Sequence, residues 1–226
     1  MSSEGVKIIT TSDGSHSLYN ESIKETYHST HGAITESQHV FIKEGIQFLV
    51  DKGCKVFNIL EVGFGTGLNA LLAYDYALKN KHITISYTTL EPYPLTEEIF
   101  SNLNYLEQLD TEISQEDFLH LHHLDFGNNI SIQENFSFTK HKKELQSFKS
   151  KDSFNLVFYD AFAPNKQSEM WSLETLKVAF ELMQSSGFLV TYCAQGQFKR
   201  DLTDLGFEVQ SIDGPPGKKE MTRAIK

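Results

Sequence analysis

The segment 56–69 constrains the fold of this chain more than any other part of the sequence. Its first seven residues, Val-Phe-Asn-Ile-Leu-Glu-Val, form an apolar run that is typical of a buried β-strand. Glycine follows at every second position, and glycine accepts positive φ and lets a ligand approach the backbone closely. The helix predicted over residues 66–79 would point its free N–H groups and positive dipole end at that ligand. The segment therefore predicts a nucleotide-type cofactor site at Gly63, Gly65 and Gly67.

Two carboxylates and the glycine spacing indicate which cofactor is bound. Glu61 stands near the end of the strand, where its carboxylate could meet a cationic group. A second apolar strand, residues 83–90, ends at Glu91, 28 residues after Gly63, and an acid there can accept both hydroxyls of a ribose. The G-x-G-x-G spacing and the longer gap disfavour NAD, whose fingerprint is G-x-G-x-x-G with an acid about 20 residues on. These features resemble class I S-adenosylmethionine-dependent methyltransferases, and a tight strand-to-helix connection without a ligand is the alternative.

The rest of the chain alternates between predicted strands and helices, which favours an α/β fold with a mostly parallel sheet and helices on both faces. We expect a Rossmann-like sheet of seven strands and one domain spanning residues 1–226. Residues 1–52 would form an N-terminal extension and leading helix, and residues 53–226 the Rossmann-like core. The seven strands are predicted at 56–62, 83–90, 130–138, 154–160, 187–192, 206–210 and 221–225.

Composition limits the choice of compartment and partner. No segment approaches the roughly 20 apolar residues of a membrane span, the first five residues lack a signal-peptide pattern, and the two cysteines form no metal pattern. We therefore expect a cytoplasmic protein without a metal. A net charge of −10 argues against general nucleic-acid binding. A polyanion would need a local basic patch, for which Lys218, Lys219 and Arg223 are the candidates; a solvated surface cluster is the alternative.

Asp160 is the candidate catalytic residue. It ends the predicted strand 154–160, and ligands of open α/β sheets lie at the carboxyl ends of the strands. The loop that follows contains Phe162 and Pro164 and is expected to face the acceptor, and Trp171 could either stack on a base or pack in the core. Methyl transfer to an amine depends mainly on positioning, so an acceptor such as Asp160 could orient the amine N–H groups. A turn or helix cap is the alternative role of Asp160.

Two motifs carry a more specific resemblance. Asp160-Ala-Phe-Ala-Pro-Asn-Lys with Glu169-Met-Trp, and Glu61-Val-Gly-Phe-Gly-Thr-Gly-Leu-Asn, are similar to the methyltransferase domains of the MnmC family of tRNA wobble-uridine modification enzymes. The ending Gly214-Pro-Pro-Gly-Lys-Lys-Glu-Met-Thr-Arg and the upstream segment 17–41 also resemble that family, so the likeness spans most of the chain.

The resemblance implies methyl transfer from S-adenosylmethionine to the aminomethyl nitrogen on C5 of the tRNA wobble uridine, in the anticodon region. It implies tRNA contacts by Lys218, Lys219 and Arg223; the other predicted substrate contacts, at the acceptor end, are Phe162, Pro164 and Trp171. Because the chain stops at Lys226 without an oxidase domain, we expect an upstream enzyme to make the aminomethyl-uridine. The family's Gly-Asp pair near adenine is absent at 138–141, so the residues that recognise adenine stay unassigned. The predicted cofactor-binding residues are Glu61, Gly63, Phe64, Gly65, Thr66, Gly67, Asn69, Glu91 and Asp160.

Three rival functions stay open at this point. An aminopropyltransferase would need further acids around its amine, and Lys166 after Asp160 disfavours a cationic polyamine. A small-amine methyltransferase would suit the acidic net charge. A nucleotide-binding module without catalysis would bind the cofactor but have no acceptor pocket beside Asp160.

Overall fold

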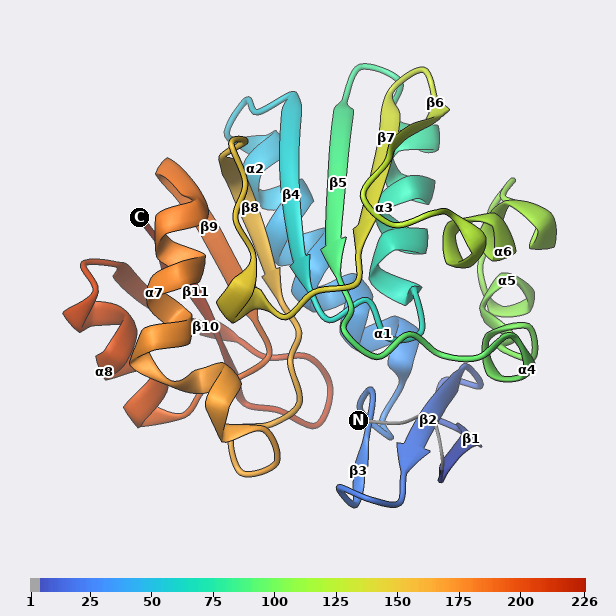
Figure 1. The fold of residues 1–226 in the computed structure, drawn as a ribbon, viewed down its shortest axis with the longest axis horizontal. Helices are drawn as coiled ribbons and strands as arrows, with labels where there is room; N and C mark the ends of the chain where they lie inside the picture. The colour runs from blue at the N-terminus through green and yellow to red at the C-terminus, as the bar shows by residue number, and fades with distance from the viewer. Residues whose placement is uncertain (1–4) are drawn as a thin grey trace.

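The computed structural model describes residues 5–226 and contains two β-sheets, the larger one surrounded by helices (Figure 1). The prediction that the chain lacks a signal peptide rests on residues 1–5, and four of these lie outside the described range. The larger sheet has the strand order β10-β11-β9-β8-β4-β5-β7-β6. Its strands are β4 (Val56–Val62), β5 (Thr84–Leu90), β6 (Asn129–Gln133), β7 (Phe136–His141), β8 (Phe154–Tyr159), β9 (Met183–Thr191), β10 (Glu208–Asp213) and β11 (Glu220–Ile225).

The five central strands of this sheet run parallel, and all of their carboxyl ends therefore meet at one edge. β4 pairs in parallel with β5 and β8, β5 with β7, and β8 with β9. β10, β11 and β6 pair antiparallel at the two sides. This arrangement confirms the predicted α/β class with a mostly parallel sheet.

The sheet has eight strands because the segment predicted as one strand, 130–138, folds as a hairpin of β6 and β7. Glu134 and Asn135 form the turn between them. The Asn135 amide is buried and donates hydrogen bonds of 2.8 Å to the carbonyls of Ala77 and Ile83. A polar residue fixed in this way interrupts the alternation, and β6 becomes an additional edge strand.

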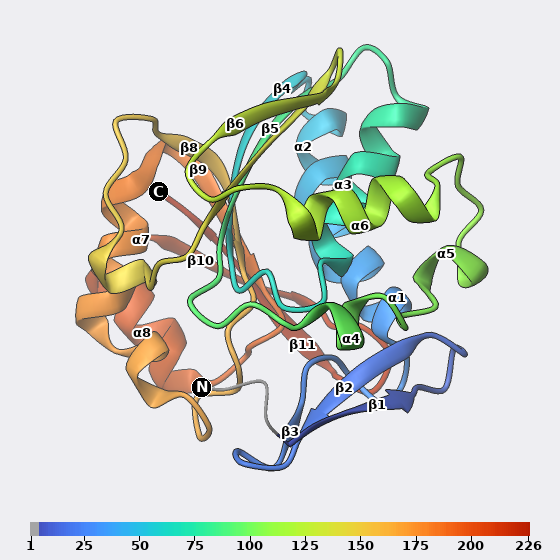
Figure 2. The ribbon, with the colours of Figure 1, turned by 45° about the vertical axis from the view of Figure 1, so that its right-hand side comes forward.

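The helices form a layer on each face of the sheet (Figure 2). One layer consists of α3 and a continuous helix of α1, a π-helical segment η1 and α2; the other contains α7 and α8. Shorter helices lie in the connections. The bounds are α1 (Ala33–Ser37), η1 (Gln38–Gln47), α2 (Phe48–Asp51), α3 (Leu68–Lys79), α4 (Glu97–Phe100), α5 (Tyr105–Gln108), α6 (Gln115–His123), η2 (Leu145–Ser147), η3 (Ser168–Trp171), α7 (Leu173–Leu182) and α8 (Gly196–Asp204).

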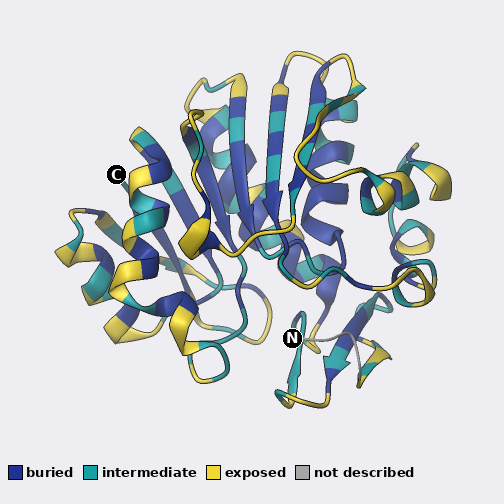
Figure 3. Cartoon of the chain, in the orientation of Figure 1, coloured by how far each residue is buried: buried dark blue, intermediate teal, exposed yellow. Residues whose placement is uncertain are grey.

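Each layer has its own apolar core, and the central strands are buried on both faces (Figure 3). Along β4, Phe57 and Ile59 belong to the core under α3 and η1, whereas Leu60 and Val62 belong to the core under α7 and α8. Side chains of a strand alternate between the two faces, so a nearly continuous apolar run is what a sheet covered on both sides requires. No helix within residues 5–226 is long and apolar enough to span a bilayer.

The N-terminal extension forms the smaller sheet, which lies beyond the carboxyl ends of the parallel strands (Figure 1). It consists of β1 (Val6–Thr10), β2 (His16–Asn20) and β3 (Glu25–Thr26), paired antiparallel. Lys166, in the loop after β8, donates 3.0 Å hydrogen bonds to the carbonyls of Ile23 and Lys24. These contacts hold the small sheet over the edge where a cofactor is expected.

Candidate active site

A cavity of about 620 Å³ lies at the carboxyl ends of the parallel strands. The turn after β4 and the segments that follow β5, β7, β8 and β9 line it, and the N-terminal extension closes its far side. This volume falls within the range of sites for small molecules and cofactors. The topology therefore gathers into one cavity several residues that the sequence only placed at separate strand ends.

The glycine turn adopts the backbone conformation that its composition predicts. Gly63, Gly65 and Gly67 all have positive φ, at 95°, 51° and 77°. A Cβ on Gly63 would lie 2.9 Å from the backbone oxygen of Asp160, so the turn and the β8 loop approach more closely than any other residue allows. Gly67 precedes α3, whose N-terminus faces the turn. Thr66 is buried and lines the same cavity.

Glu91 lies directly after β5 and lines the cavity. Its two carboxylate oxygens accept hydrogen bonds from the backbone N–H groups of Gly65, at 2.9 Å, and Tyr93, at 2.8 Å. Burial raises the pKa of this carboxyl, and the two backbone donors oppose the rise. The acid is therefore tied to the glycine turn, at the position where a ribose would lie in this fold class.

Asp160 directly follows β8, lies beside the glycine turn and lines the cavity. Its Oδ2 accepts a hydrogen bond of 2.8 Å from the side-chain amide of Asn69, on α3. Burial raises the pKa of the Asp160 carboxyl to about 7, although the Asn69 amide lowers it. A carboxyl with a pKa near neutrality, in a cavity, is a functional-site candidate on physical grounds.

Asn69 offers a second polar atom to a ligand. It lines the cavity, and its Oδ1 is buried without a hydrogen-bond partner among residues 5–226. Buried acceptors are normally paired, so a ligand N–H group would satisfy it. The glycine turn, Glu91 and this free acceptor together fit a cofactor that carries both a ribose and an amine.

Glu61 does not line the cavity, which corrects its predicted contact with a cationic group of the cofactor. It is fully buried in β4, and its Oε2 accepts a 2.6 Å hydrogen bond from the Thr89 hydroxyl on β5. Burial raises the pKa of Glu61 to about 8, although the neighbouring side chains of Thr89, Tyr87 and Asn69 lower it. Its carboxyl is mainly protonated at pH 7, so it contributes a neutral, internal hydrogen-bonding group.

Phe64, predicted to bind the cofactor, and Phe162, predicted to face the acceptor, both line the cavity. Phe64 belongs to the glycine turn and packs against His122, with ring centroids 4.8 Å apart. Phe162 follows Asp160 and meets Tyr27 edge to face, with centroids 5.0 Å apart. Tyr27 follows β3, and its ring also lies against Gly65, so the N-terminal extension supplies an aromatic wall between Phe162 and the glycine turn.

Trp171 and Pro164 do not line the cavity. Trp171 is buried among Tyr159, Tyr192 and Phe198, and its indole N–H donates a 2.7 Å hydrogen bond to the carbonyl of Phe162. Its predicted stacking on a substrate base is therefore wrong, and its role is to hold the loop after Asp160. Pro164 is half-buried in that loop and supports its course.

The three predicted basic contacts fall into three different environments. Arg223 is buried on β11, pairs with Glu44 at 2.5 Å and lies over the Phe48 ring. Its charge is used inside the protein, so its predicted contact with tRNA is wrong. Lys219 is exposed outside the cavity, and Lys218 lines the cavity.

Several lining residues have no counterpart in the sequence prediction. Tyr27 and Glu36 come from the N-terminal extension, and Tyr192 follows β9. The segment 143–146, after β7, lines the cavity at the strand end adjacent to Glu91. The position of that segment at the end of a parallel strand was a usable signal, because ligands of such sheets lie there. For the N-terminal extension, the signal was the resemblance of segment 17–41 to the MnmC family.

The fold and the site define the class of protein, and comparison with known families agrees. A family model described as S-adenosyl-L-methionine-dependent methyltransferase matches residues 100–226, more than half of the chain. The chain belongs to this family, and its sheet topology and glycine turn agree with that class of enzyme. It is therefore a methyltransferase that uses S-adenosylmethionine.

Particular relatives narrow the class. The chain is 29% identical over 215 residues to the tRNA 5-methylaminomethyl-2-thiouridine biosynthesis bifunctional protein MnmC of Cupriavidus necator, covering 91% of this chain and 32% of that protein. It is 26% identical to an uncharacterised protein of Methanocaldococcus jannaschii, covering 97% of this chain and 59% of the relative. The chain thus spans about a third of the MnmC protein that it matches.

Among solved structures, the chain is similar to MnmC2 from Aquifex aeolicus, with a TM-score of 0.76 and 27% identity. That match covers 97% of this chain and 70% of the other. The predicted resemblance to the MnmC family is confirmed over nearly the whole length of the sequence.

Proposed function

We propose that this protein transfers a methyl group from S-adenosylmethionine to the aminomethyl nitrogen on C5 of the tRNA wobble uridine. The observation that carries the proposal is the position of Asp160, between the glycine turn and an aromatic acceptor end. Similarity to MnmC and MnmC2 over more than nine-tenths of the chain supports the substrate.

The cofactor end would be formed by the glycine turn, Glu91 and Asn69. When bound there, S-adenosylmethionine supplies a methyl group already activated for transfer. The chain has to hold that group in place and exclude other acceptors. Glu91 would hold the ribose hydroxyls, and the free Oδ1 of Asn69 would accept an N–H group.

Asp160 would orient the acceptor nitrogen. Its Oδ2 already accepts from Asn69, which leaves Oδ1 for an N–H group of the substrate amine. An amine attacks only when it is uncharged and its lone pair is aimed, and positioning of this kind supplies much of the rate. The ionised carboxylate could then accept the proton that the product nitrogen must lose, because its pKa of about 7 lies near the working pH.

We also propose a division of labour within one domain. Residues 53–226 would bind the cofactor, and residues 1–52 would complete the acceptor end through Tyr27 and Glu36. A tRNA substrate would place the reaction in the cytoplasm, and it would require an enzyme that first installs the aminomethyl group.

A methyltransferase for small amines is the second candidate. Glu25 and Glu169 also line the cavity, so the acceptor end holds more acids than the sequence indicated. Carboxylates attract a cationic amine, which supports this function, as the acidic net charge of the chain also does. The same acids remove one argument against an aminopropyltransferase, although the family match stands against it.

The test is methyl transfer from radiolabelled S-adenosylmethionine to tRNA that lacks this methyl group, followed by mass spectrometry of the nucleosides. The expected product is one added methyl on 5-aminomethyl-uridine or its 2-thio form. Transfer to spermidine or other small amines, with none to tRNA, would establish the second candidate. Tight cofactor binding with no transfer to either would contradict both.

A further inference from the structure

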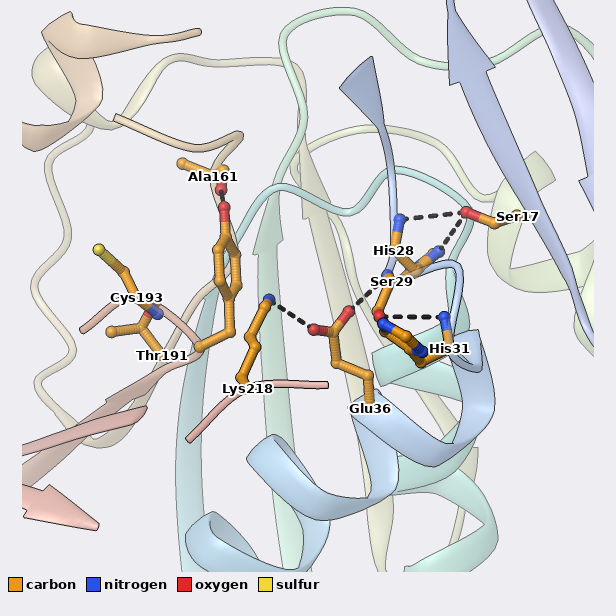
Figure 4. A network of polar contacts seen from close by, with 10 residues as sticks. Ser17, His28, Ser29, His31, Glu36, Ala161, Thr191, Cys193 and Lys218 are labelled. Atoms are coloured by element: carbon orange, nitrogen blue, oxygen red, sulfur yellow. Dashed lines mark hydrogen bonds and ion pairs between the residues drawn. The ribbon is translucent and has the colours of Figure 1, made fainter. Parts of the chain in front are cut away.

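Lys218 has a defined place at the acceptor end of the cavity, although it comes from the turn between β10 and β11 (Figure 4). Its ammonium group lies 2.7 Å from Oε1 of Glu36, a residue of α1. The same ammonium lies over the Tyr192 ring, 3.9 Å from the centroid. Two anchors from distant parts of the chain therefore hold this side chain in one position.

Both anchors are themselves fixed. The second oxygen of Glu36 accepts a 2.7 Å hydrogen bond from the backbone N–H of Ser29, and Glu36 is buried. The Tyr192 hydroxyl donates a 2.8 Å hydrogen bond to the carbonyl of Ala161, the residue after Asp160. Lys218 is thus connected through one side chain to the backbone that carries the proposed catalytic carboxylate.

The ammonium has donor capacity left for a ligand. A lysine carries three N–H donors and no acceptor. Glu36 takes one of them, and the Tyr192 ring attracts the charge through its face. Since Lys218 lines the cavity and about a third of its side chain is exposed, at least one N–H group can reach a bound acceptor molecule.

We propose that Lys218 determines specificity by donating a hydrogen bond to a ring carbonyl next to the aminomethyl carbon, the 4-carbonyl of a uracil. The inference rests on the proposed function and adds the group that reads the base. A uracil presents an acceptor oxygen at C4, whereas a cytosine presents an amino group there, which is itself a donor. A lysine can only donate, so when it is held in place it can hydrogen-bond to the uracil oxygen but not to the cytosine amino group.

The physical basis of the selectivity is a hydrogen bond from a fixed donor that only the uracil can accept. Sites built to hydrogen-bond a substrate group discriminate strongly against an analogue that cannot make the bond. The fixed positive charge of Lys218 also repels a polycation at this end of the cavity, whereas Glu25 and Glu169 would attract one. Lys219, the exposed neighbour with the same charge, has neither anchor and serves as the matched control.

The experiment uses two synthetic anticodon stem–loops, with 5-aminomethyl-uridine or 5-aminomethyl-cytidine at the wobble position. We expect the wild-type kcat/KM to favour the uridine substrate by at least about tenfold. Lys218→Met should bring the two within about threefold, chiefly by slowing the uridine reaction, and Lys218→Arg should keep most of the preference because it keeps a donor. Lys219→Met should leave the ratio at the wild-type value.

Calorimetric binding of S-adenosylmethionine and thermal unfolding show that each variant is folded. Equal use of both stem–loops by the wild type would overturn the inference and leave the proposed function intact. An unchanged ratio in Lys218→Met, or an equal loss on both substrates, would show a merely structural lysine and would also overturn it. Transfer to neither stem–loop by the wild type would contradict the proposed function and the inference together.

Discussion

The cofactor end and the acceptor end of the cavity differ in how far apart their parts lie along the chain. The cofactor end is built mainly from one stretch, 62–69, with Glu91 from the neighbouring strand. The acceptor end joins Glu36 to Lys218 across 182 positions, with Tyr27 from the extension and Phe162 from the β8 loop. Local geometry forms the first, whereas only the complete tertiary structure forms the second.

Asp160 joins the two ends, because Asn69 holds it from the cofactor side and Phe162 follows it on the acceptor side. Substitutions on one side should therefore change binding of one substrate only, and substitutions of Asp160 should change the reaction itself. The difference between the two ends can be tested by measuring cofactor affinity and acceptor kinetics separately.

Asp160→Asn should have the largest effect. The amide keeps the shape of the carboxylate but cannot accept a proton, so we expect methyl transfer to fall about a hundredfold or more. Affinity for S-adenosylmethionine, measured by calorimetry, should stay within about threefold, since the glycine turn and Glu91 are untouched. Unchanged transfer by Asp160→Asn would contradict the role that we give to this residue.

The pH dependence of the wild type provides an independent check. The pKa of Asp160 is raised to about 7, so the ionised form that accepts a proton is lost as the pH falls below that value. We expect kcat to rise with pH up to about 7, and this step should be missing from the residual activity of Asp160→Asn. A profile with the same step in both proteins would assign it to another group, such as the acceptor amine.

Gly63→Ala should weaken the cofactor end. The new Cβ would lie 2.9 Å from the Asp160 backbone oxygen, at a φ of 95°, so the turn has to shift. We expect the Kd for S-adenosylmethionine to rise by about tenfold or more, given the clash and the unfavourable φ. Gly127→Ala is the matched control, because it also has a positive φ but nothing lies within 4 Å of its Cβ; an equal effect of the two would show general destabilisation.

Glu36→Gln should weaken the acceptor end alone. Removal of the carboxylate leaves the Lys218 ammonium without its ionic partner, and we expect KM for tRNA to rise about fivefold with unchanged cofactor affinity. Glu21→Gln removes an exposed carboxylate that pairs with Lys7 in the same extension and should have little effect. A rise in the Kd for S-adenosylmethionine in Glu36→Gln would show that the two ends are not separable.

Glu61→Gln should change stability and leave activity nearly unaffected. The pKa of Glu61 is about 8 in the folded protein, against an ordinary value of about 4.3. The folded state therefore holds a proton that the unfolded state releases, and stability is lost as the pH rises from about 4.3 through 8. A glutamine stays neutral and avoids that loss.

The corresponding measurement is the Tm of wild type and Glu61→Gln between pH 4 and pH 9. The variant should gain relative to the wild type as the pH rises, and the exposed substitution Glu98→Gln should show no such trend. A constant difference across that range would contradict the proton assigned to Glu61.

The sequence by itself determined the features that depend on neighbouring residues. Apolar runs predicted β4, β5 and β8 to within a residue or two, and the glycine spacing predicted the turn that binds the cofactor. Because parallel strands end at one edge, the placement of Glu91 and Asp160 at strand ends was enough to bring both to the same cavity. The MnmC motifs then gave the family.

The tertiary structure alone decided the features that depend on distant contacts. The hairpin of β6 and β7 depends on buried hydrogen bonds from Asn135 to residues more than 50 positions away. Arg223 and Lys218 lie close together in the sequence, yet one pairs inside the protein with Glu44 and the other faces the cavity. Strand alternation and the position of the N-terminal extension decide which partner each charge meets, and neither can be deduced from the residue type.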